Sequence, residues 1–226
     1  MKKIGFIGAF DKSNLIMYVA KVLRYMEQKV LVVDSTLMQK TKYIVPSISP
    51  TKSYVTDFER IDFAIGFKNM TDIASYLGTS EEKLQYDYVL IDIDSEESIK
   101  EFEIIDSYRN YFVTAFDMYS LKKGLSILEN LKEPLKLTKI LYRYELQNDD
   151  EEYLDQMSMD YKVIWSDFTI YLPNYDQDTQ NIEENQKVYR LRLKRMSSGF
   201  QDGIIFVVQD ILDEKNAGKV RKSIKE

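Results

Sequence analysis

The sequence contains no cysteine and no histidine among its 226 residues. Without cysteine the chain forms no disulfide and offers no thiolate nucleophile, and without both residue types it lacks the usual ligands of structural zinc. The absence of histidine also excludes Ser-His-Asp triads and imidazole acid–base catalysis. Any chemistry of this protein therefore comes from carboxylates, lysines, hydroxyls and backbone groups.

Positive charge and long apolar runs are also scarce. Lys and Arg number 31 against 37 Asp and Glu, a net charge of −6, so binding to nucleic acid would need a local basic patch. No run of about 18 apolar residues is present, so we expect no transmembrane helix. The apolar run from Ile4 to Phe10 is cut short by Asp11 and Lys12, which argues against a signal peptide. Together with the lack of cysteine, this favours a cytoplasmic protein.

The apolar content is high enough for a sizeable core. Hydrophobic residues make up 44% of the chain and aromatic residues 13%, which indicates a folded globular protein. At about 150 residues per domain, the length fits one large domain or two small ones. We expect a single domain over 1–226.

Apolar strands and helical patterns alternate along the chain. The segment from Ile4 to Asp34 has the order strand, helix, strand, which predicts a βαβ unit. We expect buried strands at Ile4–Ile7, Lys29–Asp34, Asp87–Ile93, Tyr111–Phe116 and Lys139–Tyr144. Tyr161–Trp165 and Phe168–Leu172 could form one more strand or two short ones, and Phe200–Leu212 a closing helix. This order predicts an α/β fold of three layers, with a doubly wound, mostly parallel sheet and helices on both faces.

The segment from Thr36 to Thr71 is the least regular part of the chain. It contains Pro46 and Pro50 and a strand or hairpin pattern from Tyr54 to Phe67. An insertion at this place is expected to be a binding loop or a lid.

Several other segments lead to local predictions. Leucines from Leu121 to Leu131 predict a helix that Ser120 caps and Pro134 stops. The acidic stretch Asn148–Asp160 and the polar stretch Gln177–Gln186 are expected to be solvated surface.

Polar residues follow three of the predicted strands at their carboxyl ends, where doubly wound sheets bind ligands. The first loop, GAFDKSN from Gly8 to Asn14, leads into a helix start, and backbone N–H groups there can hold phosphate. Its Lys12-Ser13 pair is similar to the end of a phosphate-binding loop. Asp34 and Asp92 end the second and third strands, and Asp92 is suited to a Mg²⁺ water.

Over nearly its whole length the chain resembles the ParA/MinD family of deviant Walker-A ATPases. The loop, the VLVVD strand ending at Asp34 and the YDYVLID strand ending at Asp92 occur in the family order. The LPNYD segment with Pro173 resembles a later family loop. The resemblance implies ATP or ADP with Mg²⁺ as ligand, if any nucleotide binds. It implies nucleotide contacts from Gly8, Lys12, Ser13, Asn14, Asp34, Asp92 and Pro173, with Ser13 and Asp92 serving Mg²⁺.

The first loop departs from the family pattern Lys-Gly-Gly-x-Gly-Lys-Ser/Thr. With its last lysine aligned on Lys12, Ile7 replaces the signature lysine, and Ala9 and Asp11 replace two glycines. Only Gly8 survives. Asp11 would add repulsion beside a triphosphate unless a cation or a lysine intervenes. The loop is therefore a vestigial phosphate loop.

Other family features are also missing. Tyr142 or Arg143 stands where an asparagine would read adenine, and Leu37–Tyr43 contains no carboxylate to position the attacking water. Asp94, two residues after Asp92, is expected to be solvated. These departures imply that hydrolysis by the family mechanism is lost.

Each candidate site residue also has a structural interpretation. In the structural interpretation Lys12 begins a helix that Ser13 caps, and this is favoured over phosphate contact. Asp34 and Asp92 either hold Mg²⁺ or satisfy loop N–H groups.

Two basic segments lie late in the chain. Arg190, Arg192, Lys194 and Arg195 are interspersed with Leu191 and Leu193, so an extended strand would place the even positions on one basic face. A partner or DNA could read that face; a charge-protected edge strand is the favoured alternative. The basic tail 215–226 has only Val220 and Ile224 on one face, too little for stable membrane anchoring, so a solvated tail is expected.

The resemblance leads to three functional hypotheses. The first is a pseudo-ATPase, similar to TadZ-like localisation proteins, that acts as a scaffold for a pilus, secretion or partition assembly and is recruited by partners to a cell pole or the inner membrane face. Ile7 and Phe10 would make its nucleotide face apolar and favour a homodimer. The second hypothesis is an active divergent ATPase that moves plasmid, chromosome or other cargo. The third is a DNA-binding partition accessory.

Overall fold

The computed structural model describes residues 1–47, 52–143, 149–214 and 217–223. Its centre is an eight-stranded sheet in the order β3-β4-β2-β5-β1-β6-β7-β8. All neighbouring strands are parallel except β3 and β4, which pair antiparallel. The strands are β1 Lys2–Ile7, β2 Val30–Asp34, β3 Tyr54–Phe58, β4 Ile61–Ile65, β5 Tyr88–Ile93, β6 Arg109–Ala115, β7 Leu135–Arg143 and β8 Val163–Pro173.

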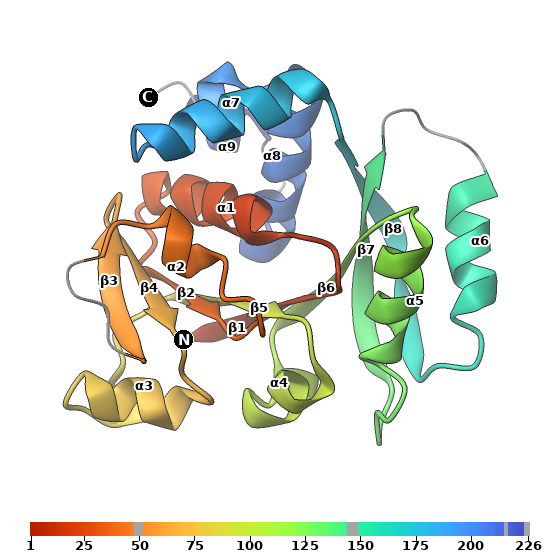
Figure 1. The fold of residues 1–226 in the computed structure, drawn as a ribbon, viewed down its shortest axis with the longest axis horizontal. Coiled ribbons are helices and arrows are strands. Elements are labelled where there is room, and N and C mark those ends of the chain that lie inside the picture. The colour runs from red at the N-terminus through yellow and green to blue at the C-terminus, as the bar shows by residue number, and fades with distance from the viewer. Residues whose placement is uncertain (48–51, 144–148, 215–216, 224–226) are drawn as a thin grey trace.

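Helices cover both faces of the sheet (Figure 1). Helices α1, α8 and α9 pack on one face, whereas α3, α4, α5 and α6 contribute to the core on the other. The arrangement confirms the predicted three-layer α/β fold. The helices are α1 Ser13–Tyr25, α2 Thr41–Ile44, α3 Met70–Tyr76, α4 Glu96–Glu101, α5 Met118–Ser126, α6 Asp149–Met157, α7 Asp176–Lys187, α8 Ser198–Leu212 and α9 Ala217–Ser223; short 3₁₀ turns lie at Glu81–Lys83, Ile104–Asp106 and Leu193–Arg195.

Strand β1 shows how the sequence builds the two cores. Side chains of a strand alternate between faces, so Ile4 and Phe6 enter the core under α1 and α8, while Ile7 enters the opposite core. All three are fully buried. Burying each side chain stabilises the fold by about 1.5–3 kcal/mol. Ile7 is therefore a core residue, and the prediction that it forms part of an apolar dimer face is wrong.

The region between β2 and α3 extends the sheet. Strands β3 and β4 form an antiparallel hairpin, and β4 pairs with β2. The hairpin pattern from Tyr54 to Phe67 is therefore an edge of the sheet and not a lid. At the other edge, the two segments around Trp165 and Phe168 form the single strand β8, with an irregularity in its register opposite Leu137 and Lys139.

Helix α5 begins and ends earlier than the sequence predicts. Asp117, and not Ser120, is its N-cap, because the Asp117 carboxylate accepts hydrogen bonds from both the backbone N and Oγ of Ser120. The helix ends at Ser126, before Pro134, as the hydrogen bonds of Ile127 and Leu128 tighten to three-residue spacing.

Helix α6 covers Asp149–Met157 of the first polar segment, followed by a turn at 158–160, and α7 covers the second segment, 177–186. Helix α7 is solvated on one side, but Asp178 and Asn185 are buried on the other. Asp178 accepts hydrogen bonds from the backbone N and Oγ of Ser197, each at 2.6 Å. The solvated interpretation of Gln177–Gln186 is therefore wrong for these two side chains.

The two late basic segments differ from expectation. Residues 190–192 are irregular and Leu193–Arg195 is a 3₁₀ turn, so no basic strand exists there. The alternation arises because Leu191 and Leu193 are both buried in the core. In the described part of the tail, Val220 on α9 is fully buried against that core, so the expectation of a solvated tail is wrong for this residue, whereas Lys219 and Arg221 are exposed. Ile224 lies outside the described residues.

Candidate functional site

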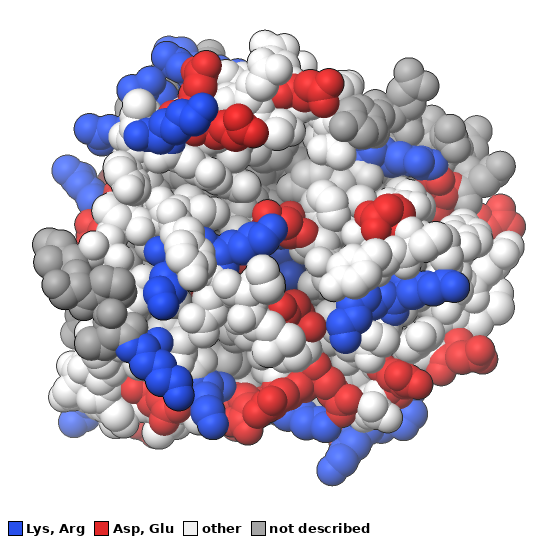
Figure 2. Space-filling model, in the orientation of Figure 1, with Lys and Arg blue, Asp and Glu red and all other residues white. Residues whose placement is uncertain are grey.

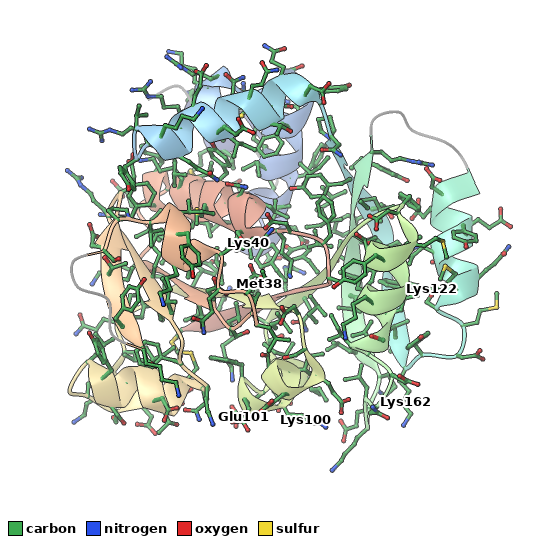
Figure 3. The ribbon with its side chains drawn as sticks, in the orientation of Figure 1. Met38, Lys40, Lys100, Glu101, Lys122 and Lys162 are labelled. Atoms are coloured by element: carbon green, nitrogen blue, oxygen red, sulfur yellow. The ribbon has the colours of Figure 1, made fainter. Side chains whose placement is uncertain are left out.

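The candidate site lies at the carboxyl ends of the central strands. Strand β5 runs between β2 and β1, and its register places Asp92 beside both Asp34 and Phe6. The loops after β1, β2 and β5 enclose a cavity of about 320 Å³ whose lining includes Gly8, Lys12, Ser13 and Asp92. In Figure 3, Met38 and Lys40 of the second loop lie near the centre of the view, below α1.

Lys12 is turned into the protein. Its Nζ lies 2.7 Å from Asp92 Oδ1 and donates a hydrogen bond of 2.8 Å to the carbonyl oxygen of Gly8. Both side chains are almost completely buried, at 2% and 4% exposed. Lys12 occupies the N-cap of α1 without a side-chain cap, and Ser13 does not cap either, so the predicted Ser13 cap is wrong.

Burial strongly affects Asp92. Loss of water around its carboxylate raises the pKa of Asp92 to about 6; Lys12 opposes this rise, and the charge of Asp34 adds to it. The carboxylate is thus costly to keep charged, and Lys12 is the cation that offsets this cost. The Lys12–Asp92 ion pair is therefore part of the protein's own structure.

The Asp34 carboxylate accepts hydrogen bonds from its own loop with both oxygens. Its Oδ1 accepts hydrogen bonds from the backbone N and Oγ1 of Thr36, at 3.1 and 2.6 Å. Its Oδ2 accepts one from the backbone N of Thr41 at 3.0 Å, and the side chain is buried. Asp34 therefore satisfies loop N–H groups and does not line the cavity.

Gly8 is required by packing alone. A Cβ at this position would lie 2.1 Å from the carbonyl oxygen of Val113 on β6. The backbone φ of +151° also falls where other residues are strained. The one surviving glycine of the loop is therefore explained by the close approach of β1 and β6, without any phosphate.

The negative charge of Asp11 is paired with Lys40. Its Oδ2 lies 2.9 Å from Nζ of Lys40, and its Oδ1 accepts a hydrogen bond from the backbone N of Ser13. Burial acts against the charged form, but these two partners hold the pKa of Asp11 below its usual range. Blue and red side chains lie next to each other near the centre of the face in Figure 2. Sequence reasoning missed Lys40.

Asp94 is more enclosed than predicted. Both of its carboxylate oxygens accept from the backbone N of Leu37, at 3.2 and 3.0 Å, and the residue is half-buried. Burial raises the pKa of Asp94 above its usual value. The expectation of a solvated Asp94 is wrong, because it joins the loops after β5 and β2.

A second cavity of about 260 Å³ adjoins the first, with Phe10 and Asp11 in both linings. It holds the two remaining predicted site residues, Asn14 and Pro173. The rings of Phe10 and Tyr142 pack with centroids 4.7 Å apart, and burial raises the pKa of Tyr142. This aromatic pair fills part of the space beside the loop where an adenine-reading asparagine was expected.

The structure thus gathers most of the predicted site residues at two adjoining cavities. The arginines form no part of the site: Arg190 lies 3.7 Å from Glu59, and Arg195 lies 3.2 Å from Glu184. The cavities also contain Thr36, Met38 and Tyr119, which carried no recognisable signal in the sequence.

The donors for Mg²⁺ do not fit a resident ion. Within the described residues, no three acidic side chains come together to hold a metal. Ser13 lines the cavity, but the Asp92 carboxylate is already paired with Lys12. Protein sites bind Mg²⁺ through one or two carboxylates plus substrate phosphates. The residues of the cavity therefore do not hold Mg²⁺ by themselves.

Solved structures with this fold share little sequence with the chain. A ParA family ATPase from Chlorobium tepidum TLS has a TM-score of 0.61 at 13% identity, over 92% of this chain and 97% of its own. A plasmid partition protein from Borrelia burgdorferi B31 bound to AMPPNP reaches 0.62 at 14%, over 94% and 98%. A chain of the MinC:MinD cell division protein complex from Aquifex aeolicus reaches 0.65 at 10%, over 96% and 97%.

These likenesses establish the fold as that of ParA/MinD-type P-loop ATPases. No protein-family profile and no curated protein sequence matches the chain. Across the described residues, the structure also contains no helix that is long and apolar enough to span a membrane.

Proposed function

We propose that this protein is a ParA/MinD-fold pseudo-ATPase that works as a scaffold for spatial localisation. The observation that carries the proposal is the state of Lys12, whose ammonium group is buried against Asp92 and the Gly8 carbonyl. A phosphate that recruits Lys12 must leave the Asp92 carboxylate buried without its cation. Breaking a buried pair in this way costs about 3–5 kcal/mol.

The rest of the loop also opposes triphosphate binding. Asp11 brings a carboxylate to the edge of the cavity, and its partner Lys40 is already engaged. Asp34 and Asp94 hold the loops around the cavity through backbone N–H groups. Both carboxylates are therefore committed to structure, and the loop after β2 has no further carboxylate to orient a water.

A scaffold needs a surface for partners, and the loop after β2 together with helices α2 and α5 supplies one beside the cavity. Leu37, Met38, Tyr43 and Tyr119 are 69–83% exposed, and Met118 is 47% exposed. Met38 and Tyr119 line the cavity itself. We propose that this apolar surface supports a homodimer and contacts with the proteins of a pilus, secretion or partition assembly, which would recruit the chain to its place in the cell.

An active ATPase is the second candidate. It is favoured by the presence of Lys12, Ser13 and Asp92 at one cavity and by the AMPPNP bound to the Borrelia protein of the same fold. In that case the Lys12–Asp92 pair would open when ATP and Mg²⁺ enter together.

Calorimetric titration with ATP and ADP plus Mg²⁺ separates the two candidates. The scaffold proposal predicts no heat of binding up to about 1 mM nucleotide, weaker than about −4 kcal/mol. The variant Ala9→Gly/Asp11→Gly, which restores two loop glycines and removes the repulsive carboxylate, should bind more tightly than the natural chain. Micromolar binding by the natural chain that is lost in Lys12→Met would contradict the proposal, as would phosphate release that Lys12→Met abolishes.

DNA binding requires free cations, and two of the three proposed arginines have carboxylate partners. We therefore expect that the protein does not change the electrophoretic mobility of duplex DNA at low salt. A salt-dependent shift that disappears in Arg190→Gln/Arg192→Gln/Arg195→Gln would instead favour a partition accessory.

A further inference from the structure

A different cavity lies at the opposite end of the sheet, where the central strands begin. It has a volume of about 460 Å³ and sits beside the amino ends of β2 and β4 and the residues just before β5. We call it the amino-end cavity. Its charged lining consists of Arg24, Lys29, Arg60, Lys83, Asp57 and Asp62.

The four cations of the amino-end cavity are available for a ligand. Within the described residues, the side chains of Arg24, Lys29, Arg60 and Lys83 form no ion pair and no hydrogen bond. Four cations and two carboxylates give the lining a net charge of 4 − 2 = +2, although the whole chain carries −6. Unpaired positive charge gathered around one hollow attracts anions.

The turn between β3 and β4 holds one of these cations in a strained position. Glu59 and Arg60 both have left-handed backbone angles, with φ of 57° and 63°. Such two-residue turns favour Asn-Gly and Asp-Gly, because other side chains are strained there. Strained residues of this kind concentrate at ligand-binding and catalytic sites.

Glu59 anchors the turn from the other side. Its carboxylate pairs with Lys21 of α1, lies 3.7 Å from Arg190 and accepts a hydrogen bond of 3.4 Å from the backbone N of Leu191. The Glu59 side chain is only 12% exposed. These contacts fix the turn while the next residue, Arg60, lines the cavity.

The carboxylates of the cavity limit what can bind. Asp57 and Asp62 lie directly opposite each other on β3 and β4, and the Tyr86 hydroxyl donates a hydrogen bond of 2.7 Å to Asp62. The carboxylates leave acceptors for ligand hydroxyls, while the guanidinium groups of Arg24 and Arg60 suit bidentate contact with phosphate oxygens. We propose that the amino-end cavity binds a small phosphate-bearing anion. Its volume lies in the range of small-molecule sites.

Titration with pyrophosphate, followed by calorimetry at physiological ionic strength, tests the proposal on the full chain. Arg24→Gln and Arg60→Gly are each expected to weaken binding at least about tenfold, the loss of one charge-assisted hydrogen bond. Arg60→Gly also relieves the strained turn, so its melting temperature should rise while its affinity falls. Lys194→Gln is the matched control, because it removes one exposed cation that does not line the cavity and should leave affinity unchanged.

Three results would overturn the proposal. One is the absence of pyrophosphate binding up to about 1 mM. Another is an equal loss of affinity in Lys194→Gln and Arg60→Gly, which would indicate general charge attraction. The third is binding to phosphatidylcholine vesicles containing phosphatidylglycerol without binding of pyrophosphate, which would assign the cations to a membrane surface. Binding to both, with Arg60→Gly weakening the pyrophosphate complex, would support the cavity as a site whose ligand is either free or carried by a lipid headgroup.

Discussion

The charged side chains at the carboxyl ends of the strands are paired, whereas the cations of the amino-end cavity are unpaired within the described residues. At the carboxyl ends, Lys12 is paired with Asp92, Lys40 with Asp11, and Asp34 is satisfied by its own loop. At the amino ends, the cations around the amino-end cavity have no partner among the described residues. A residue at a familiar motif position therefore does not by itself make a binding site. Charges that satisfy each other stabilise the fold, whereas charges left unpaired around a cavity can bind a ligand.

The largest effect should come from breaking the buried pair. Lys12→Met leaves the Asp92 carboxylate buried alone, and we expect the free energy of unfolding to fall by about 3–5 kcal/mol. Denaturant unfolding of Lys12→Met and of Lys12→Met/Asp92→Leu measures this, and the double variant should recover most of the loss. A single variant as stable as the natural chain would mean that Lys12 is not a structural cation.

The same carboxylate should make stability depend on pH. The pKa of Asp92 is raised to about 6 in the folded protein, above its ordinary value of 3.8, so the folded state binds the proton more tightly. The contribution of Asp92 to stability is therefore greatest below pH 4 and declines as the pH rises toward 6. Urea unfolding of the natural chain and of Asp92→Asn between these pH values should show a smaller decline in the variant.

A smaller loss is expected from removing the anchor of the second loop. Asp34→Ala leaves the backbone N–H groups of Thr36 and Thr41 without their acceptor, at a cost of about 1–3 kcal/mol. Thermal unfolding of Asp34→Ala is compared with that of Asp57→Ala, which removes an exposed carboxylate at the amino-end cavity. An equal loss of stability in both variants would show that carboxylates at the carboxyl and amino ends of the strands support the fold alike.

The smallest effects belong to the amino-end cations. Arg24→Gln breaks no ion pair, so its change in unfolding free energy should stay within about 0.5 kcal/mol. Arg60→Gly should raise stability by about 1 kcal/mol, because glycine accepts the left-handed backbone of the turn without strain. A clear destabilisation by either change would show that these cations support the fold.

Much of the fold could be predicted because its signals are local. The βαβ unit and the strands ending at Asp34 and Asp92 follow from apolar runs and helical spacing, and the structure has them at those places. The signals failed where tertiary contacts override a pattern. Arg190, Arg192 and Arg195 suggested a strand, whereas the pattern reflects two leucines that reach the core from an irregular segment.

The sequence predicts which positions contribute to the site but not which of these side chains contact each other. Residue types at strand ends indicate where Lys12 and Asp92 lie, but nothing in the sequence shows that they pair with each other. Likewise Asp11 gives no sign that it meets Lys40, 29 residues further along the chain. Partners across long sequence separations are set by packing, which a single sequence does not display.

Helices α7 and α8, which come late in the chain, cover α1, and this affects the rate of folding. Tyr18 on α1 receives a hydrogen bond of 2.8 Å from Asn185, 167 residues later, and packs edge-on against Phe200. During synthesis, the apolar outer side of α1 has to wait for these segments to leave the ribosome before it is covered. Contacts this distant in sequence slow folding, and exposed apolar helices aggregate meanwhile. We therefore expect the docking of α7 and α8 onto α1 to be a late step of folding, and a chaperone would protect the apolar side of α1 until then.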